Sequence, residues 1–396
     1  MKNNHILEKV RKFELAKKVQ AMGLYPYFRE IESGLDTEVI IGGKKILMFG
    51  SNSYLGLNTH PEVKKASLDA VEKYGTGCAG SRFLNGTLDI HVQLEEELAD
   101  FVGKEASLLF STGFQVNLGT LSGLIGRNEY IIADKYNHAS IVDGCRLSFG
   151  KTLKYEHNDI DDLGRVLKSI PADKSKLVVT DGIFSMEGDI VALPGIVDAA
   201  EKYNASIMLD DAHSIGVLGK NGAGTASHFN LTEKVYLIMG TFSKSLASLG
   251  GFIASDKDTI HYLKHHSREL IFSASMPPAN VASVSAALHV MKREPERIEK
   301  LWQNTKRMLN GTKDLGLNVG RSETPVIPVY VGDSITCFKM CKMLQDEGIF
   351  VNPAVPPAVS EGACIIRLSL MATHTNVQID FALSKIKKVA RELKII

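Results

Sequence analysis

Two polar side chains that could act together on an aldehyde follow two separate apolar runs of the chain. Asp210 comes directly after the run at residues 206–209, and Lys244 comes shortly after the run at residues 235–239. A lysine beside a buried strand loses hydration, so its pKa falls and its amine can form a Schiff base. An aspartate can keep a pyridine ring protonated as an electron sink. The pair predicts a pyridoxal phosphate site, with Lys244 holding the aldehyde as an imine and Asp210 at the ring nitrogen.

Neither residue carries this prediction alone, because most lysines are solvated surface charges. A phosphate site is also required, and the chain offers one. Residues 108–114 read Leu-Leu-Phe-Ser-Thr-Gly-Phe, which is typical of a strand, a turn and the start of a helix. The free N–H groups of Gly113 and Phe114 at that helix start would favour a dianionic phosphate. The hydroxyl groups of Thr241 and Ser243 could add further donors.

Three more residues have types and positions that suit such a cofactor and an amino-acid substrate. His138 follows the apolar run at residues 130–133, so it could stack on the ring; the simpler interpretation is a structural histidine. Ser185 follows another apolar run and could hydrogen-bond the phenolic oxygen. Arg367 lies inside an apolar strand, where an unpaired guanidinium is costly, so it needs an anion such as the substrate carboxylate. A structural salt bridge is the alternative.

The elements that must position these residues are short apolar runs alternating with helical spacing between about residues 60 and 255. Helical spacing marks residues 61–73 and 88–101. The strand-like runs are residues 107–110, 130–133, 177–180, 206–209 and 235–239. This alternation predicts an α/β fold with a mostly parallel central sheet flanked by helices. Ligands of such sheets bind beyond the carboxyl ends of the strands.

The regular alternation of strand-like and helical patterns ends at about residue 280. Helical spacing continues through Ala286 and Ile298 to Leu309, which predicts one long helix. The segments that follow indicate strands at residues 326–330 and 365–370, a helix around 338–344 and a terminal helix. We expect an N-terminal segment at 1–55, a large cofactor-binding domain at 56–285 and a small C-terminal α/β domain at 286–396.

The composition argues against several classes of protein. The 396 residues carry 46 Lys and Arg against 45 Asp and Glu, a net charge of +1, so no basic excess indicates a nucleic-acid partner. The 5 cysteines are widely spaced without a C-x-x-C pair, which argues against a disulfide framework or a metal site. Neither a signal-type core nor a membrane-spanning run is evident. We expect a cytoplasmic protein.

The first twenty residues contain six Lys and Arg and two Glu, with Ile6, Val10 and Phe13 at helical spacing. They predict a basic amphipathic helix. It would pack on the body of the protein or on a partner subunit. Weak peripheral contact with an anionic membrane surface is the alternative.

The ordered set of motifs resembles one known family, the α-oxoamine synthases. The motifs are Asp-Asp-Ala-His at 210–213, Thr-Phe-Ser-Lys at 241–244 and the segments around His138 and Ser185. Enzymes of this family are pyridoxal-phosphate-dependent transferases of fold type I, which condense an amino acid with an acyl-CoA and release CO2. The resemblance extends from residues 52–57 to residues 371–375. Within the family, the sequence segments at 75–87, 240–245 and 353–358 most resemble the branch that uses L-serine with palmitoyl-CoA.

The resemblance also implies roles for residues that spacing alone does not assign. His213 would lie beside the phenolic oxygen of the cofactor, with Ser185. Asn52 would join Arg367 in binding the substrate carboxylate. Ser273 would reach the phosphate from the neighbouring subunit, because the sites of this family lie at a homodimer interface.

Three alternatives stay open. A sister synthase would use glycine or alanine with a shorter acyl-CoA, as 2-amino-3-ketobutyrate CoA ligase and 8-amino-7-oxononanoate synthase do. An aminotransferase of the same fold would form pyridoxamine without consuming CoA esters. A catalytically silent partner subunit is the third, although such a chain would be expected to lack the lysine found at position 244.

Overall fold

The computed structural model describes residues 5–396, and its largest element is a seven-stranded sheet in the order β3-β9-β8-β7-β6-β4-β5. Strand β9 runs antiparallel to both of its neighbours, and the pairs from β8 to β5 are parallel. The strands are β3 (Ala106–Phe110), β4 (Tyr130–Asp134), β5 (Lys151–Tyr155), β6 (Lys176–Asp181), β7 (Ser206–Asp210), β8 (Leu237–Thr241) and β9 (Gly251–Ser255).

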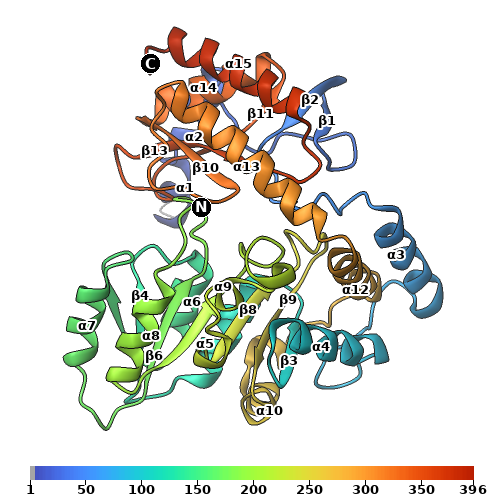
Figure 1. Ribbon diagram of the computed structural model, residues 1–396, viewed down its shortest axis with the longest axis vertical. Coiled ribbons are helices and arrows are strands. Elements are labelled where there is room, and N and C mark those ends of the chain that lie inside the picture. Colours follow the sequence, from blue (N-terminus) through green and yellow to red (C-terminus); the bar gives the residue numbers. More distant parts are fainter. Residues whose placement is uncertain (1–4) are drawn as a thin grey trace.

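Both faces of this sheet are covered, because successive residues of each central strand are apolar and point to opposite sides. In β7, Leu209 joins one core cluster and Met208 joins the other. The flanking helices surround the sheet in the lower part of Figure 1. They are α3 (Pro61–Tyr74), α4 (Asp89–Val102), α5 (Gly113–Leu124), α6 (Ala139–Leu147), α7 (Ile160–Lys168), α8 (Leu193–Lys202), α9 (Thr225–His228), α10 (Lys257–His266), α11 (Arg268–Ile271) and α12 (Pro278–Arg293), with the 3-10 turns η1 (Lys220–Gly222) and η2 (Thr232–Lys234).

A smaller part, in the upper half of Figure 1, holds two three-stranded sheets with the orders β1-β2-β11 and β10-β13-β12. The N-terminal strands therefore join the C-terminal part, since β2 pairs with β11 in parallel. The remaining elements are α1 (His5–Arg11), α2 (Leu15–Ala21), β1 (Glu38–Ile41), β2 (Lys44–Met48), α13 (Glu296–Asp314), β10 (Val326–Gly332), α14 (Ser334–Asp346), β11 (Ile349–Phe350), β12 (Asn352–Ala354), β13 (Cys364–Ser369) and α15 (Asn376–Glu392).

The structure confirms the predicted fold class, a mostly parallel sheet flanked by helices with a smaller C-terminal α/β part. The expected boundaries at residues 55 and 285 remain a prediction. Cys337 and Cys341 lie on the buried face of α14. Across residues 5–396, no helix has the length and apolar character needed to cross a bilayer.

Three predicted elements differ in the structure. The long helix is wrong: the chain breaks between α12 and α13, because Pro295 has no N–H to donate and disfavours a helical Glu294. The strand expected at 235–239 begins at Leu237 and extends to Thr241. The expected N-terminal helix is two helices, α1 and α2, separated at residues 12–14.

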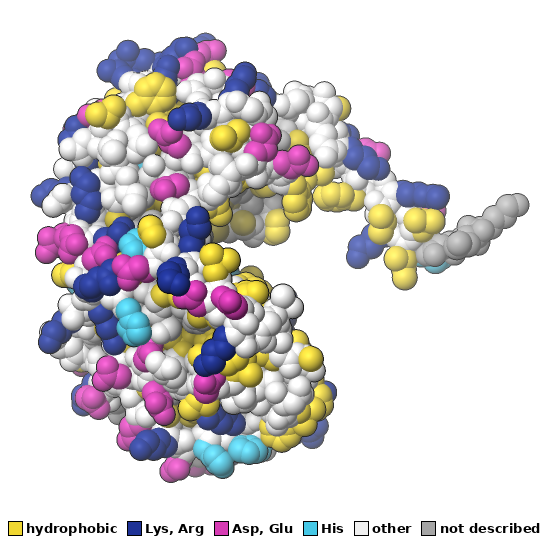
Figure 2. Space-filling view, turned by 90° about the vertical axis from the view of Figure 1, so that its right-hand side faces the viewer, with side chains coloured by type: hydrophobic (Ala, Val, Ile, Leu, Met, Phe, Trp, Pro, Cys, Tyr) yellow, Lys and Arg dark blue, Asp and Glu magenta, His cyan; other side chains and the backbone are white. Residues whose placement is uncertain are grey.

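The N-terminal segment projects from the body in the space-filling view (Figure 2). Its apolar side chains at Ile6, Val10 and Phe13 are exposed. The same view shows the surface deeply hollowed between the two parts of the molecule, with hydrophobic side chains inside the hollow.

Candidate active site

A cavity of about 500 Å³ opens at the carboxyl ends of the central strands, between the two parts of the molecule. Asp210 ends β7 and Thr241 ends β8, so the parallel strands carry both residues to the same edge. The cavity brings together all but one of the site residues predicted from the sequence, namely Asn52, Gly113, Phe114, His138, Ser185, Asp210, His213, Thr241, Ser243, Lys244 and Arg367.

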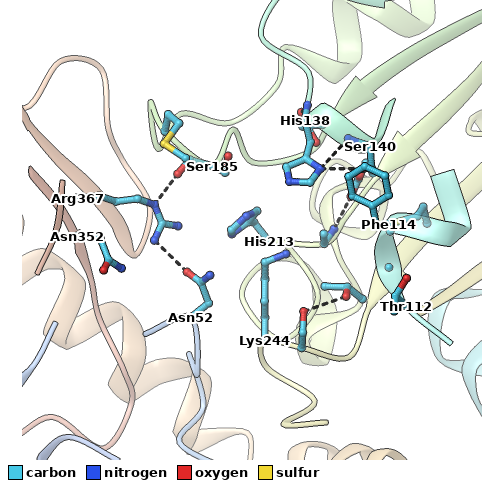
Figure 3. A pocket seen from close by; sticks show the side chains of 18 of the residues that line it. Asn52, Thr112, Phe114, His138, Ser140, Ser185, His213, Lys244, Asn352 and Arg367 are labelled. Carbon is cyan, nitrogen blue, oxygen red and sulfur yellow. Dashed lines mark hydrogen bonds between the residues drawn. The ribbon is translucent and has the colours of Figure 1, made fainter. Parts of the chain in front are cut away.

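Lys244 lies in the middle of this cavity, between the groups on its two sides (Figure 3). Burial lowers the pKa of its amine to about 8, although the nearby carboxylate of Asp210 opposes the shift. About a tenth of the amine is therefore unprotonated at pH 7, far more than for an ordinary solvated lysine. This is the state in which a lysine attacks a carbonyl or accepts a proton.

The carboxylate of Asp210 is buried and fixed in place by two donors. Asn117 Nδ2 donates to Asp210 Oδ2 at 2.7 Å, and the backbone N–H of Ala212 donates to Oδ1 at 3.0 Å. Asn117 comes from α5 and is itself fully buried. Asn117 was missed; the available signal is an asparagine one helical turn after Gly113, in the helix that begins at the predicted phosphate site.

His138 is the N-cap residue of α6 and is held by both its backbone and its ring. Its N–H donates to Asp181 Oδ2 at 2.8 Å, and its Nδ1 accepts from the backbone N–H of Ser140 at 3.3 Å. Burial lowers the pKa of His138, which favours a neutral ring. Burial also raises the pKa of Asp181, and the adjacent Asp210 raises it further. Asp181 lines the cavity and was missed, although it opens the segment that contains Ser185.

His213 is hydrogen-bonded from behind by Tyr54, whose hydroxyl lies 2.7 Å from His213 Nδ1. Burial lowers the pKa of His213 well below its usual range, so the ring is neutral. Burial raises the pKa of Tyr54, so its hydroxyl keeps its proton. Tyr54 was also missed, because nothing local in the sequence relates it to a histidine far along the chain.

The end of the cavity near α5 has the features of a phosphate cradle. Thr112 caps the helix by accepting from the N–H of Gln115 at 3.2 Å. The N–H groups of Gly113 and Phe114, in the first turn, have no intrahelical partners. Thr241 Oγ1 and Ser243 Oγ lie 3.2 Å apart beside them. A Cβ at Gly113 would approach Thr241 Oγ1 to 2.5 Å, so only glycine leaves this end open.

The opposite side of the cavity is formed by Arg367 and its partners (Figure 3). Arg367 Nε donates to the carbonyl oxygen of Ser185 at 2.6 Å, and Nη1 donates to Asn52 Oδ1 at 3.0 Å and to Ser369 Oγ at 2.7 Å. No acidic side chain pairs with Arg367 among these contacts, so its charge is available for an anion in the cavity.

Ser273 is the predicted site residue that the chain does not bring to this cavity. It lines a separate small hollow, where its Oγ accepts from Gln115 Nε2 at 3.0 Å. Its predicted role requires a second subunit, so the single chain leaves that role a prediction.

These residues fit pyridoxal phosphate. The open cradle at Gly113 suits a phosphate, the buried carboxylate of Asp210 suits a ring nitrogen that carries a proton, and the amine of Lys244 suits an aldehyde. The three lie along one cavity large enough for a small molecule.

The comparisons with known proteins agree with this chemistry. The sequence pattern of the family described as "Aminotransferase class I and II" matches residues 44–386. The chain belongs to this family, and its resemblance to the α-oxoamine synthases is confirmed.

Two similar proteins and one solved structure show which members of the family this chain resembles. The serine palmitoyltransferase of Sphingobacterium spiritivorum is 57% identical over 395 residues, which cover 100% of this chain and 99% of that protein. The 8-amino-7-oxononanoate synthase of Lysinibacillus sphaericus is 41% identical over 96% of this chain and 97% of its own. A solved serine palmitoyltransferase variant from S. paucimobilis, with a PLP–myriocin aldimine bound, has a TM-score of 0.97 at 34% identity and covers 100% of both chains.

Proposed function

We propose that this chain is a pyridoxal-phosphate-dependent serine palmitoyltransferase. It condenses L-serine with palmitoyl-CoA and releases CoA, CO2 and 3-ketodihydrosphingosine, the first step of sphingolipid biosynthesis. The observation that carries the proposal is the 57% identity with a serine palmitoyltransferase over the whole chain. The cavity supports it, because it combines a free lysine amine, a cradle for phosphate and an arginine available for a carboxylate.

The residues of the sheet edge would hold the cofactor. The N–H groups of Gly113 and Phe114, with the hydroxyls of Thr241 and Ser243, would bind the phosphate. Asp210 would bind the ring nitrogen and His138 would cover one face of the ring. His213 and Ser185 would donate to the phenolic oxygen. Bound pyridoxal phosphate supplies an aldehyde that links to the substrate amine and a ring that accepts the electron pair left at the α-carbon.

Arg367 and Asn52 would hold the carboxylate of serine. A clamped carboxylate would fix the orientation of the bonds at the α-carbon, so Arg367 and Asn52 would help to select which of these bonds breaks. Lys244 would remove the α-proton, since its lowered pKa leaves the amine able to accept one. The α-carbon would then attack the thioester carbonyl, and CoA would leave as a thiolate that takes up a proton from water. Loss of the carboxylate as CO2 and return of a proton to the α-carbon complete the reaction.

A sister synthase is the second candidate. Its support is the 41% identity with an 8-amino-7-oxononanoate synthase over nearly the whole chain. That identity is lower than the 57% identity with the serine palmitoyltransferase, so we propose serine and a long-chain acyl-CoA as the substrates.

We also propose a cytoplasmic homodimer in which Ser273 contributes to the phosphate site of the partner subunit. The exposed apolar residues Ile6, Val10 and Phe13 on the projecting N-terminal segment support contact with a second surface. That surface is the partner subunit or, as a weaker interaction, an anionic membrane.

The test is CoA release by the purified enzyme with serine, glycine and alanine, each combined with acyl-CoA esters of several chain lengths. The proposal expects serine with palmitoyl-CoA to give the highest kcat/KM. A preference for alanine or glycine with a short acyl chain would establish the sister synthase instead. Pyridoxamine formation without CoA release would indicate an aminotransferase.

A further inference from the structure

A second cluster of buried charges lies outside the cavity, beside the turns that carry His138 and Ser185. His157 stands between two carboxylates: its Nδ1 lies 3.1 Å from Asp134 Oδ1 and its Nε2 lies 3.0 Å from Asp189 Oδ2. Its side chain is 14% exposed, and those of Asp134 and Asp189 are 0% and 9% exposed. None of the steps described above uses these three residues.

The geometry determines the charge of this histidine. A neutral imidazole donates from one nitrogen only, whereas ionised carboxylates only accept. Both nitrogens of His157 face such oxygens, so both carry a proton and the ring is an imidazolium. Burial alone would lower the pKa of His157, but the hydrogen bonds that its ring donates to Asp134 and Asp189 outweigh burial and raise the pKa to about 9.

The imidazolium connects the two turns physically. Tyr136 stacks on its ring with centroids 4.5 Å apart, and the ring of Phe184 meets it edge-on at 4.3 Å. Asp134 accepts from the backbone N–H of Tyr136 at 2.8 Å, which orders the turn before His138. Phe184 and Asp189 close the other turn, since the N–H of Phe184 donates to the carbonyl of Asp189 at 3.1 Å.

Ser185 lies in the turn closed by Phe184 and Asp189, and this turn contacts the smaller part of the molecule. The carbonyl of Ser185 accepts from Arg367 Nε at 2.6 Å, and the carbonyl of Gly188 accepts from Thr324 Oγ1 at 2.9 Å. A shift of this turn would therefore move an acceptor that orients the Arg367 guanidinium. A guanidinium binds a carboxylate through a planar pair of donors, so its orientation affects affinity.

We propose that His157, clamped as a cation between Asp134 and Asp189, is a positioning residue that holds the Ser185 turn under Arg367 and thereby sets the affinity for the amino-acid carboxylate. The inference rests on the proposed role of Arg367 in serine binding. It adds a residue outside the cavity to the determinants of KM for serine.

The pH dependence of this clamp follows from the groups around it. Within residues 5–396, the titratable side chains that face His157 are Asp134 at the end of β4, Tyr136 just after it, and Glu187 and Asp189 from the turn. Burial raises the pKa of Glu187, and the charge of His157 opposes this rise. As pH rises through about 9, His157 loses its second proton and can no longer donate to both carboxylates.

The experiment compares His157→Gln with the wild-type holoenzyme, and His289→Gln serves as the matched control because His289 pairs with one carboxylate, Glu97, at the surface. Serine binding is followed by the absorbance of the cofactor, and the serine midpoint is the serine concentration that gives half of the absorbance change. We expect both this midpoint and KM for serine to rise about tenfold in His157→Gln. This is within the loss of up to about 10²-fold that misplacement can cause. KM for palmitoyl-CoA and cofactor content should stay within about twofold of wild type.

Raising the pH should abolish most of this difference. From about pH 7.5 to about pH 10, the ratio of serine midpoints between His157→Gln and wild type should fall toward about one, because wild type loses its cation too. The ionisation of serine itself affects both proteins equally and cancels in the ratio. A folded His157→Gln enzyme with an unchanged serine midpoint would overturn the inference.

Nuclear magnetic resonance of ring-labelled wild-type histidines gives a measurement that does not need the variant to fold. The His157 signal should report two protonated nitrogens at neutral pH and titrate near pH 9. A neutral ring at neutral pH would overturn the inference. If the wild-type enzyme shows no response to serine at all, the proposed function fails instead, and the two failures are thereby distinguished.

Discussion

The two sides of the cavity are built differently. The sheet wall, formed by Asp181, Asp210, His138, Thr241 and Lys244, sits on strand ends and adjoining turns, and its polar groups are bonded to neighbouring helices and turns. The arginine wall, formed by Asn52, Asn352 and Arg367, belongs to the smaller part of the molecule and touches the sheet wall where Arg367 meets the Ser185 carbonyl. A wall whose polar groups are held by hydrogen bonds suits a resident cofactor, and a wall on a separate part suits a substrate that must enter and leave.

This contrast predicts that changes on the sheet wall reduce kcat or cofactor binding, whereas changes on the arginine wall raise KM for serine. The predictions that follow run from the largest expected effect to the smallest.

The largest effect should come from Lys244→Ala. Turnover should fall by at least about 10³-fold, because the variant lacks both the amine that binds the aldehyde and the base that takes the α-proton. Some cofactor should remain bound through the phosphate cradle and Asp210. CoA release measures the first effect, and absorbance after desalting measures the second. Wild-type turnover in this variant would show that Lys244 takes no part in the reaction.

Asp210→Asn should be the next most severe change. The amide keeps the size of the side chain but loses the charge that stabilises a protonated ring nitrogen, so kcat should fall about 10²-fold. KM for serine should change far less, since the arginine wall is intact. Single-turnover absorbance kinetics with serine would separate the two effects, and a near-normal kcat would refute the proposed role of Asp210.

Arg367→Lys tests the opposite wall. A lysine keeps the charge but loses the planar pair of donors, so KM for serine should rise about tenfold while cofactor content stays at the wild-type level. Steady-state kinetics with serine varied at saturating palmitoyl-CoA provides the measurement. If instead the variant loses its cofactor, the assignment of cofactor binding to the sheet wall and of serine binding to the arginine wall is wrong.

The smallest effect concerns the pH dependence of cofactor loading. The amine of Lys244 has a pKa lowered to about 8 by burial, so its reactive neutral fraction grows as pH rises and levels off above that value. The rate at which cofactor-free enzyme takes up pyridoxal phosphate should therefore rise about fivefold from about pH 7 to about pH 8 and flatten above about pH 9. A rate that keeps rising tenfold per pH unit would mean an unshifted lysine.

Much of the sheet wall could be predicted from the sequence, because parallel strands bring their carboxyl ends to one edge. Asp210 and Thr241 each end a strand, so short apolar runs were enough to place them together. Arg367 was recognisable as a cation inside an apolar strand. These inferences needed only the local pattern and one rule of topology.

The supporting residues could not be predicted in this way. Tyr54 and His213 meet across 159 positions of the chain, and the contact depends on how the smaller part folds back onto the sheet. Asn117 acts through a buried face of α5, where apolar and polar residues alternate without a clear stripe, so spacing alone does not show which polar side chain points to the site. Their positions follow from tertiary packing.

Some elements of the fold were missed for local reasons. Strand β5 at Lys151–Tyr155 is an edge strand with exposed lysines, so it lacks an apolar run. Strand β9 starts directly after Gly250, whose positive φ of 124° lies outside regular strand geometry. The break before α13 was visible as Pro295, but apolar spacing continues across it and indicated one helix.

The most direct test of the central claim is identification of the product formed from serine and palmitoyl-CoA. We predict that mass spectrometry of the lipid extract detects 3-ketodihydrosphingosine, with one CoA and one CO2 released for each molecule formed. Absence of this product, while CoA is released with alanine or glycine as the amino acid, would contradict the account.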